Sequence, residues 1–167
     1  MSETIPILTD DQVRDWFDRE FLVDEFNGRR VLLIVPDSTR TAPLPLLFDI
    51  VAPKLMDHAV QLDVLVALGT HPAMSDSAIQ ELLGISTEDR SGKYANIGLF
   101  NHEWDRPDRL VTIGSFDRKE TAEISNGLLS IDVPVSINSR ITDYDVLLVL
   151  GPVFPHEVVG FSGGNKY

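Results

Sequence analysis

Three short apolar runs dominate the pattern of hydrophobic and polar positions along the chain. They occupy residues 30–36 (R-V-L-L-I-V-P), 61–68 (Q-L-D-V-L-V-A-L) and 145–150 (D-V-L-L-V-L). Each run is rich in leucine and β-branched residues and lacks alternation, which is typical of strands buried on both faces. Weaker strand patterns, the second with period-two alternation, lie at residues 110–114 and 132–138.

Helical patterns fill most segments between these strands. The clearest helix begins at Thr9 or Asp10, and its apolar residues form one face up to about Phe21. Pro53 should kink or split the second helix, because proline removes a backbone hydrogen bond. Gly84 should end the third. The helices predicted after the first cover residues 46–58, 75–83 and 117–125, and residues 86–109 are expected to be polar and rich in turns.

Strands that alternate with helices predict an α/β fold with a mostly parallel, Rossmann-like sheet and helices on both faces. No linker divides the sequence, so residues 1–167 are expected to form a single domain. In such sheets, ligands bind outside the carboxyl ends of the strands. Each strong strand ends in a polar cluster: Asp37-Ser38-Thr39-Arg40, then Thr70-His71, then His156 with the glycine-rich loop 162–166. We expect these clusters to share one crevice.

The glycine-rich loop reads Ser162-Gly163-Gly164-Asn165-Lys166. Its two glycines allow backbone N–H groups to approach a ligand closely, and the serine and lysine add donors, which suits an anionic or phosphate-bearing group. Such a loop normally opens into a helix whose N-terminus helps to hold the anion, but this sequence ends at Tyr167. We therefore expect the chain to be the N-terminal part of a larger protein.

Composition narrows the classes of partner. The net charge of −12 argues against nucleic acid and against anionic membrane surfaces, since both need a basic face. The chain has no cysteine, so it has neither disulfides nor thiolate metal sites. It also lacks an apolar run of roughly 20 residues and a signal-peptide core, which favours a cytoplasmic protein.

The candidate side chains fit acid–base chemistry on a small acid. Histidine can take up and release a proton near neutral pH, so His71 and His156 on opposite faces of a substrate would work in either direction. Racemisation and epimerisation need this property. Arg40 offers a fork of donors that matches a carboxylate. The pattern therefore favours a small carboxylate-bearing substrate between two imidazoles.

Each of these residues also has an ordinary structural interpretation. A histidine after a strand often bonds the backbone, Asp37 could cap a turn, and Arg40 could pair with an acidic residue. His58 and His102 give weaker signals, and no residue of the chain is predicted to bind a metal, because the histidines lack close ligand spacing. Two alternatives stay open: a non-catalytic module that binds a nucleotide or phosphate, and a hydrolase or sugar-phosphate enzyme that uses Asp37 with His71 or His156. The hydrolase is disfavoured because no G-x-S-x-G motif or cysteine nucleophile is present.

Three motifs together resemble the N-terminal domain of the nickel-dependent lactate racemase family. They are D-S-T-R (37–40), A-L-G-T-H (67–71) and G-P-V-F-P-H-E-V-V-G-F-S-G-G-N-K (151–166), and the step from His156 to Lys166 is the most specific part. The stretches N-H-E-W-D (101–105) and I-N-S-R-I-T-D-Y-D (137–145) also resemble the family. Pro72 stands where lactate-specific members tend to have arginine, which suggests a different hydroxy acid.

The resemblance implies a 2-hydroxy-acid racemase or epimerase that uses a nickel-pincer nucleotide. Lys166 would form a thioamide link to this cofactor, and Ser162, Gly163 and Gly164 would lie in its loop. Asp37, Ser38, Thr39 and Arg40 would contact the nucleotide, with Arg40 also reaching the substrate. His71 and His156 would exchange the proton while hydride passes between the α-carbon and the cofactor.

Other features that the resemblance implies lie outside this sequence. The nickel ligand of the family is a histidine beyond residue 167, and further substrate-binding residues belong to a C-terminal domain. Proteins of cofactor synthesis are the implied partners. We therefore expect the isolated chain to be an incomplete, inactive part of a racemase.

Overall fold

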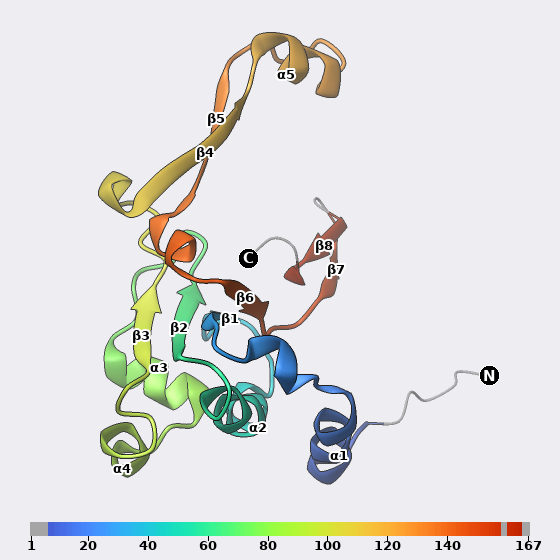
Figure 1. Cartoon of the computed structure of the whole chain (residues 1–167). Helices are drawn as coiled ribbons and strands as arrows, with labels where there is room; N and C mark the ends of the chain where they lie inside the picture. Colours follow the sequence, from blue (N-terminus) through green and yellow to red (C-terminus); the bar gives the residue numbers. More distant parts are fainter. Residues whose placement is uncertain (1–6, 158–159, 165–167) are drawn as a thin grey trace, which may run out of the picture.

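A four-stranded parallel sheet forms the centre of the computed structural model, which describes residues 7–157 and 160–164 (Figure 1). The strand order is β3-β2-β1-β6. The bounds are Arg30–Pro36 for β1, Gln61–Ala67 for β2, Gly98–Asn101 for β3 and Val146–Val149 for β6. All three pairings are parallel, and β1 is buried from Val31 to Pro36, as its apolar sequence predicts. The α/β class with a parallel sheet is confirmed.

Helices pack on one face of this sheet, at the bottom of Figure 1. The main core lies between them and the side chains of Val31, Leu33 and Val35, which point to this face. Phe48 of α2 and Ile79 of α3 are almost fully buried in it. These elements are α1 (Asp10–Glu20), η1 (Val23–Phe26), α2 (Leu44–Met56), α3 (Asp76–Leu83) and α4 (Thr87–Ser91).

The other face of the sheet differs from the expectation of helices on both faces. Leu32, Ile34 and Leu65 form a small cluster there, covered by Ile141 and Tyr144. Ile141 belongs to η3 (Ser139–Asp143), a 3-10 turn, and no α-helix of the described residues packs on this cluster. The reason is that most of the chain between β3 and β6, which would cover this face in a doubly wound fold, projects away from the sheet.

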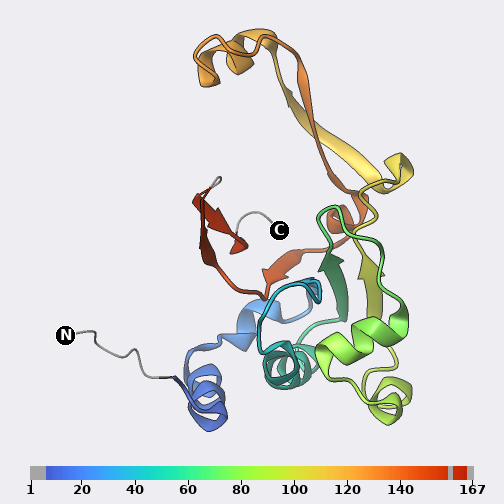
Figure 2. The same ribbon diagram turned by 180° about the vertical axis from the view of Figure 1, so that it is seen from behind.

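This projecting segment is an antiparallel ribbon with a short helix at its tip (Figures 1 and 2). It consists of η2 (Pro107–Arg109), β4 (Leu110–Phe116), α5 (Arg118–Ile124) and β5 (Val133–Asn138). The strands predicted at 110–114 and 132–138 therefore exist, but they pair with each other and not with the parallel sheet. Their half-polar sequences do not supply apolar side chains for two buried faces, and β4 is mostly exposed.

Local signals place the helices well. Thr9 caps α1 in a capping box, Ser75 caps α3, and Gly84 ends α3 with φ +68°. Pro53 does not split α2, which continues through it in the last turn. Residues 86–109 contain more structure than expected, namely α4, the edge strand β3 and η2.

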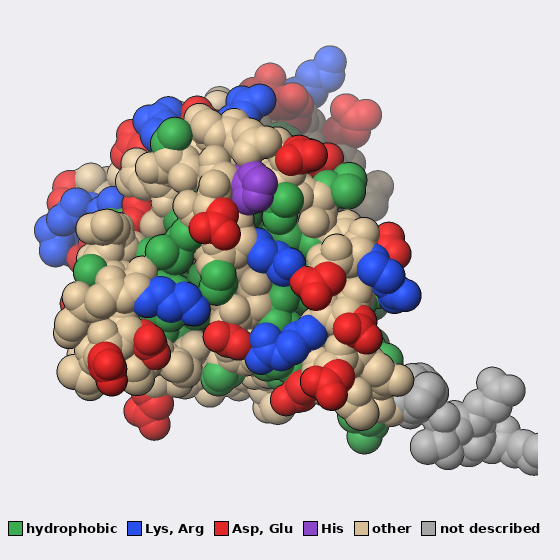
Figure 3. All heavy atoms as spheres, turned by 60° about the horizontal axis from the view of Figure 1, so that its bottom comes forward, with side chains coloured by type: hydrophobic (Ala, Val, Ile, Leu, Met, Phe, Trp, Pro, Cys, Tyr) green, Lys and Arg blue, Asp and Glu red, His purple; other side chains and the backbone are tan. Residues whose placement is uncertain are grey.

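The surface of the helical side shows acidic and basic side chains interspersed (Figure 3). No described helix is both long and apolar enough to cross a membrane. At the other end of the chain, β7 (Phe154–His156) and β8 (Gly160–Ser162) form a small antiparallel ribbon after β6.

Candidate functional site

A cleft of about 570 Å³ lies at the carboxyl ends of β1 and β2, on the side of the sheet away from the helices. Strands β2 and β3 lie on one side of β1 and β6 lies on the other, so the order reverses between β1 and β6. Open parallel sheets bind ligands at this kind of reversal. The polar side chains that line the cleft are Asp37, Thr39, Arg40, Thr70, His71, His102, Ser136, Asn138 and Ser162.

Asp37 and His71 form a bonded pair at this cleft. Pro36 and Ala67 are partners in the register of β1 and β2, and a turn closed by the bond from His71 N to Leu68 O brings His71 back over Asp37. The Nδ1 of His71 lies 2.5 Å from Oδ2 of Asp37. The side chain of Asp37 is 6% exposed and that of His71 is 51% exposed. A buried carboxylate therefore orients an accessible imidazole.

The carboxylate of Asp37 has further partners. Its Oδ1 accepts hydrogen bonds from Thr39 N at 3.1 Å and from Thr39 Oγ1 at 2.6 Å. Burial raises the pKa of Asp37, but the hydrogen bonds from Thr39 and His71 outweigh burial, and the net pKa is lowered. Because the ionised carboxylate only accepts hydrogen bonds, Nδ1 of His71 is the protonated nitrogen, and Nε2 of the neutral ring is an acceptor.

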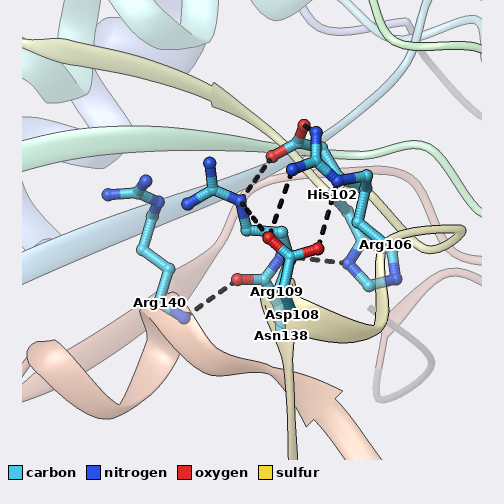
Figure 4. Close-up of polar contacts among 7 residues, drawn as sticks. His102, Arg106, Asp108, Arg109, Asn138 and Arg140 are labelled. Carbon is cyan, nitrogen blue, oxygen red and sulfur yellow. Dashed lines mark hydrogen bonds and ion pairs between the residues drawn. The ribbon is translucent and has the colours of Figure 1, made fainter.

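His102 is a second imidazole of the same cleft, and its sequence signal is weak. It follows β3, where its backbone N donates to Val66 O at 3.0 Å. Its Nδ1 lies 3.1 Å from Nδ2 of Asn138, whose Oδ1 accepts from the backbone N of Arg140 (Figure 4). Burial lowers the pKa of His102 and favours the neutral ring. The N-H-E-W-D resemblance was the available signal.

The loop that contains His71 is braced from β3. Asn101 accepts from Met74 N at 3.0 Å and donates to Met74 O at 2.9 Å, and Trp104 Nε1 donates to the His71 carbonyl at 3.3 Å. Beside this loop, Arg106 and Arg109 pair with Glu103 and Asp108, as Figure 4 shows in part. These contacts fix the two histidine-containing loops relative to each other.

The predicted site residues divide into three groups. Asp37, Thr39, Arg40, His71, Ser162 and Gly163 line the cleft together. Ser38 and Gly164 are each adjacent in sequence to a lining residue but do not line the cleft themselves. His156 lies in β7 and is not among the lining residues either. Lys166 lies outside the described residues, so its predicted position next to the cleft stays a prediction.

The described residues fit an anionic ligand such as a nucleotide phosphate. Arg40 is exposed at the cleft and forms no ion pair with any residue that the structure describes. Gly163 and Gly164 have φ values of +81° and +60°, a backbone that favours glycine and can turn N–H groups toward an anion. Within the ranges 7–157 and 160–164, no group of three or more His, Asp or Glu side chains could hold a metal ion.

The cleft lies where the strand order of a parallel sheet reverses. This is the place where α/β proteins with open parallel sheets bind their ligands. Residues 17–167 match the model of the lactate racemase N-terminal domain, and the chain belongs to this family. It is also similar to the crystal structure of a protein from Thermotoga maritima, with 27% identity and a TM-score of 0.80. That match covers 95% of this chain, which spans 37% of the Thermotoga chain. No curated protein matches the sequence.

Proposed function

We propose that this chain is the cofactor- and substrate-binding part of a racemase or epimerase that acts on a small 2-hydroxy acid. Family membership supports the class. The observation that carries the proposal is the Asp37–His71 pair in a cleft that also contains Arg40. Isomerisation of a 2-hydroxy acid would use a base, a carboxylate that orients the base, and a guanidinium such as that of Arg40, which pairs with no described residue.

In this proposal the substrate carboxylate binds Arg40, and the substrate hydroxyl donates its hydrogen bond to Nε2 of His71. His71 takes the hydroxyl proton as the α-carbon is oxidised and gives it back when the α-carbon is reduced. Asp37 holds the ring in the tautomer that can accept this proton and stabilises the imidazolium that forms. The proposed role of His156 is the same proton exchange on the opposite face of the substrate.

The proposed cofactor is the nickel-pincer nucleotide, which when bound would accept hydride from the α-carbon and return it. Arg40, Thr39 and the glycine-rich loop would hold its phosphate, and Lys166 would be its point of attachment. This assignment is supported by the cleft lining, in which Arg40, Thr39 and Gly163 can contact an anion. The proposed partners are the proteins that synthesise the cofactor.

Mass spectrometry of the intact full-length protein that contains this chain, made together with cofactor-synthesis proteins, tests the proposal. We expect an adduct on Lys166 that the Lys166→Arg variant lacks, and chiral analysis should show D and L interconversion of a 2-hydroxy acid only in the protein with the adduct. His71→Asn should keep the adduct and lose the interconversion. An adduct-free protein with no isomerase activity would refute the proposal.

The same experiment distinguishes the proposed racemase or epimerase from a second candidate, a non-catalytic module that binds a nucleotide. Its support is the guanidinium of Arg40, which pairs with no residue that the structure describes and lines the same cleft as Gly163, whose φ is +81°. Any phosphate could use these two groups. Nucleotide binding in the cleft without an adduct and without isomerisation would favour this module.

A further inference from the structure

His102 and His71 line the same cleft, and both also line a second hollow of about 390 Å³ that adjoins it. They follow neighbouring strands, β3 and β2, which pair in parallel up to Asn101 and Val66. The two imidazoles therefore face one region of the molecule. The protonation of each ring is fixed by a different partner.

The hydrogen bonds of the Asn138 amide indicate which tautomer of His102 is present. The backbone N of Arg140 can only donate, so the atom of Asn138 that it contacts is the oxygen. The amide NH₂ of Asn138 then donates to Nδ1 of His102. Nδ1 is an acceptor, and the proton of the neutral ring lies on Nε2.

The arrangement at His71 is the reverse. Its Nδ1 donates to Asp37, which leaves Nε2 as an acceptor when the ring is neutral. No residue in the described part of the chain bonds the Nε2 atom of either ring. Of these two lining residues, His71 therefore keeps Nε2 as an acceptor and His102 keeps Nε2–H as a donor, each without a partner among the described residues.

We propose that His102 is a substrate-binding residue whose Nε2–H donates to an oxygen of the ligand while Nε2 of His71 accepts from the ligand hydroxyl. A 2-hydroxy carboxylate has this pair of groups on adjacent carbons, a hydroxyl that donates and a carboxylate that only accepts. The two rings together select for a hydroxyl next to a carboxylate, and Asn138 is the residue that positions His102. This inference rests on the proposed function for its substrate class.

Nitrogen-15 NMR of the histidine rings tests the inference in the full-length protein that contains this chain, with lactate and glycerate as ligands and propionate, which lacks the hydroxyl, as the control. At neutral pH we expect a protonated Nε2 on His102 and a protonated Nδ1 in the neutral ring of His71. Lactate or glycerate should shift the Nε2 resonances of both rings, and propionate should leave that of His71 unchanged.

Two variants separate a bond to the ligand from a structural role. His102→Leu removes the donor, and we expect about tenfold weaker hydroxy-acid binding, the loss typical for one hydrogen bond to a charged group. His102→Gln places an amide N–H near the position of Nε2 and should bind within about threefold of the parent, since its donor replaces that of the imidazole. Equal binding by the leucine variant would overturn the inference.

The outcomes also separate this inference from the proposed function. A hydroxy acid that shifts only His71, or an Nδ1-protonated His102, would overturn the role of His102 and leave the proposed function standing. If no hydroxy acid shifts any resonance of the cleft, the substrate class itself is wrong and both proposals fail.

Discussion

The Asp37→Asn substitution tests the central pair of the cleft most directly. Asparagine keeps one oxygen, which can still accept both hydrogen bonds from Thr39, so the turn after β1 should be preserved. Its NH₂ group would then face Nδ1 of His71. Because this amide donates, Nδ1 must accept, and the proton of the neutral ring moves to Nε2. We therefore expect Nε2 of His71 to become a donor, so that it can no longer accept a hydrogen bond from a substrate hydroxyl.

The magnitude follows from the one bond that changes. A hydrogen bond to a charged group contributes about 1.5–3 kcal/mol and a neutral one about 0.5–1.5 kcal/mol. Since His71 is half exposed, we take the lower end of the difference, about 1 kcal/mol, as the cost in unfolding free energy at neutral pH. Isomerase activity of the cofactor-loaded protein should fall by about 10²–10⁴-fold, because the base has the wrong tautomer.

The stabilisation by the Asp37 carboxylate should depend on pH in a direction that its pKa shift predicts. The pKa of Asp37 is lowered in the folded state, so its carboxylate stabilises the fold above the unfolded value of about 3.9. This contribution is lost as the pH falls through the lowered folded value. Urea unfolding should therefore show a difference between parent and variant at pH 7 that disappears in acid.

Asp49→Asn is the matched control, because it removes a carboxylate from an exposed pair with Arg14 at 2.8 Å. It should cost less than about 0.5 kcal/mol and leave the His71 tautomer unchanged. If Asp37→Asn leaves Nδ1 of His71 protonated, or if its activity equals that of the control, the assignment of Asp37 as the orienting group is refuted.

Two further predictions concern the stability of the fold, and a third concerns Arg40 at the cleft. Gly84→Ala should cost about 2 kcal/mol in urea unfolding, since Gly84 has φ +68° and a Cβ there would lie 2.7 Å from a proline side chain. Tyr144→Phe should cost about 1–2 kcal/mol, because the phenol donates to the buried carboxylate of Asp63. Burial and Asp63 raise the pKa of Tyr144, so this phenol should resist ionisation in a spectrophotometric titration, and its stabilisation should be lost as the pH rises above about 10. Arg40→Ala should weaken AMP binding about tenfold by calorimetry, and Arg14→Ala should not.

The sequence predicted those elements whose signals are local. The three apolar strands and the caps at Thr9, Ser75 and Gly84 are where the pattern indicates, because burial on both faces and orphan N–H groups constrain nearby residues. The edge strand β3 was missed. It has only four half-buried residues, and the bond from Gly98 N to the Asp63 carboxylate anchors its start from another strand.

Pairing between distant segments could not be read from the pattern. The alternation in 132–138 predicted a strand correctly, but nothing local indicated that its partner would be β4 and not the parallel sheet. His102 was undervalued for the same reason, since the amide that fixes its tautomer belongs to Asn138, 36 residues away in the chain. His156 lies in β7 and not among the residues that line the cleft, and Lys166 lies outside the described residues, so the predicted role of each stays a prediction.

The fold alone supplies the hydrogen-bond partners that favour one tautomer in each of the two imidazoles, His71 and His102. Asp37 is buried, and the described partners of its carboxylate, Thr39 and His71, lie in the loops that follow β1 and β2. Asn138 is anchored by the backbone of η3. The free energy that holds the acceptor and the donor in place therefore comes from the sheet and its loops, and a ligand would not have to supply it on binding. Arg40 differs, because its exposed side chain pairs with no described residue. Its position is therefore not part of what stabilises the fold. Substitutions at Asp37 or Asn138 should consequently change both stability and binding, whereas a substitution at Arg40 should change binding alone.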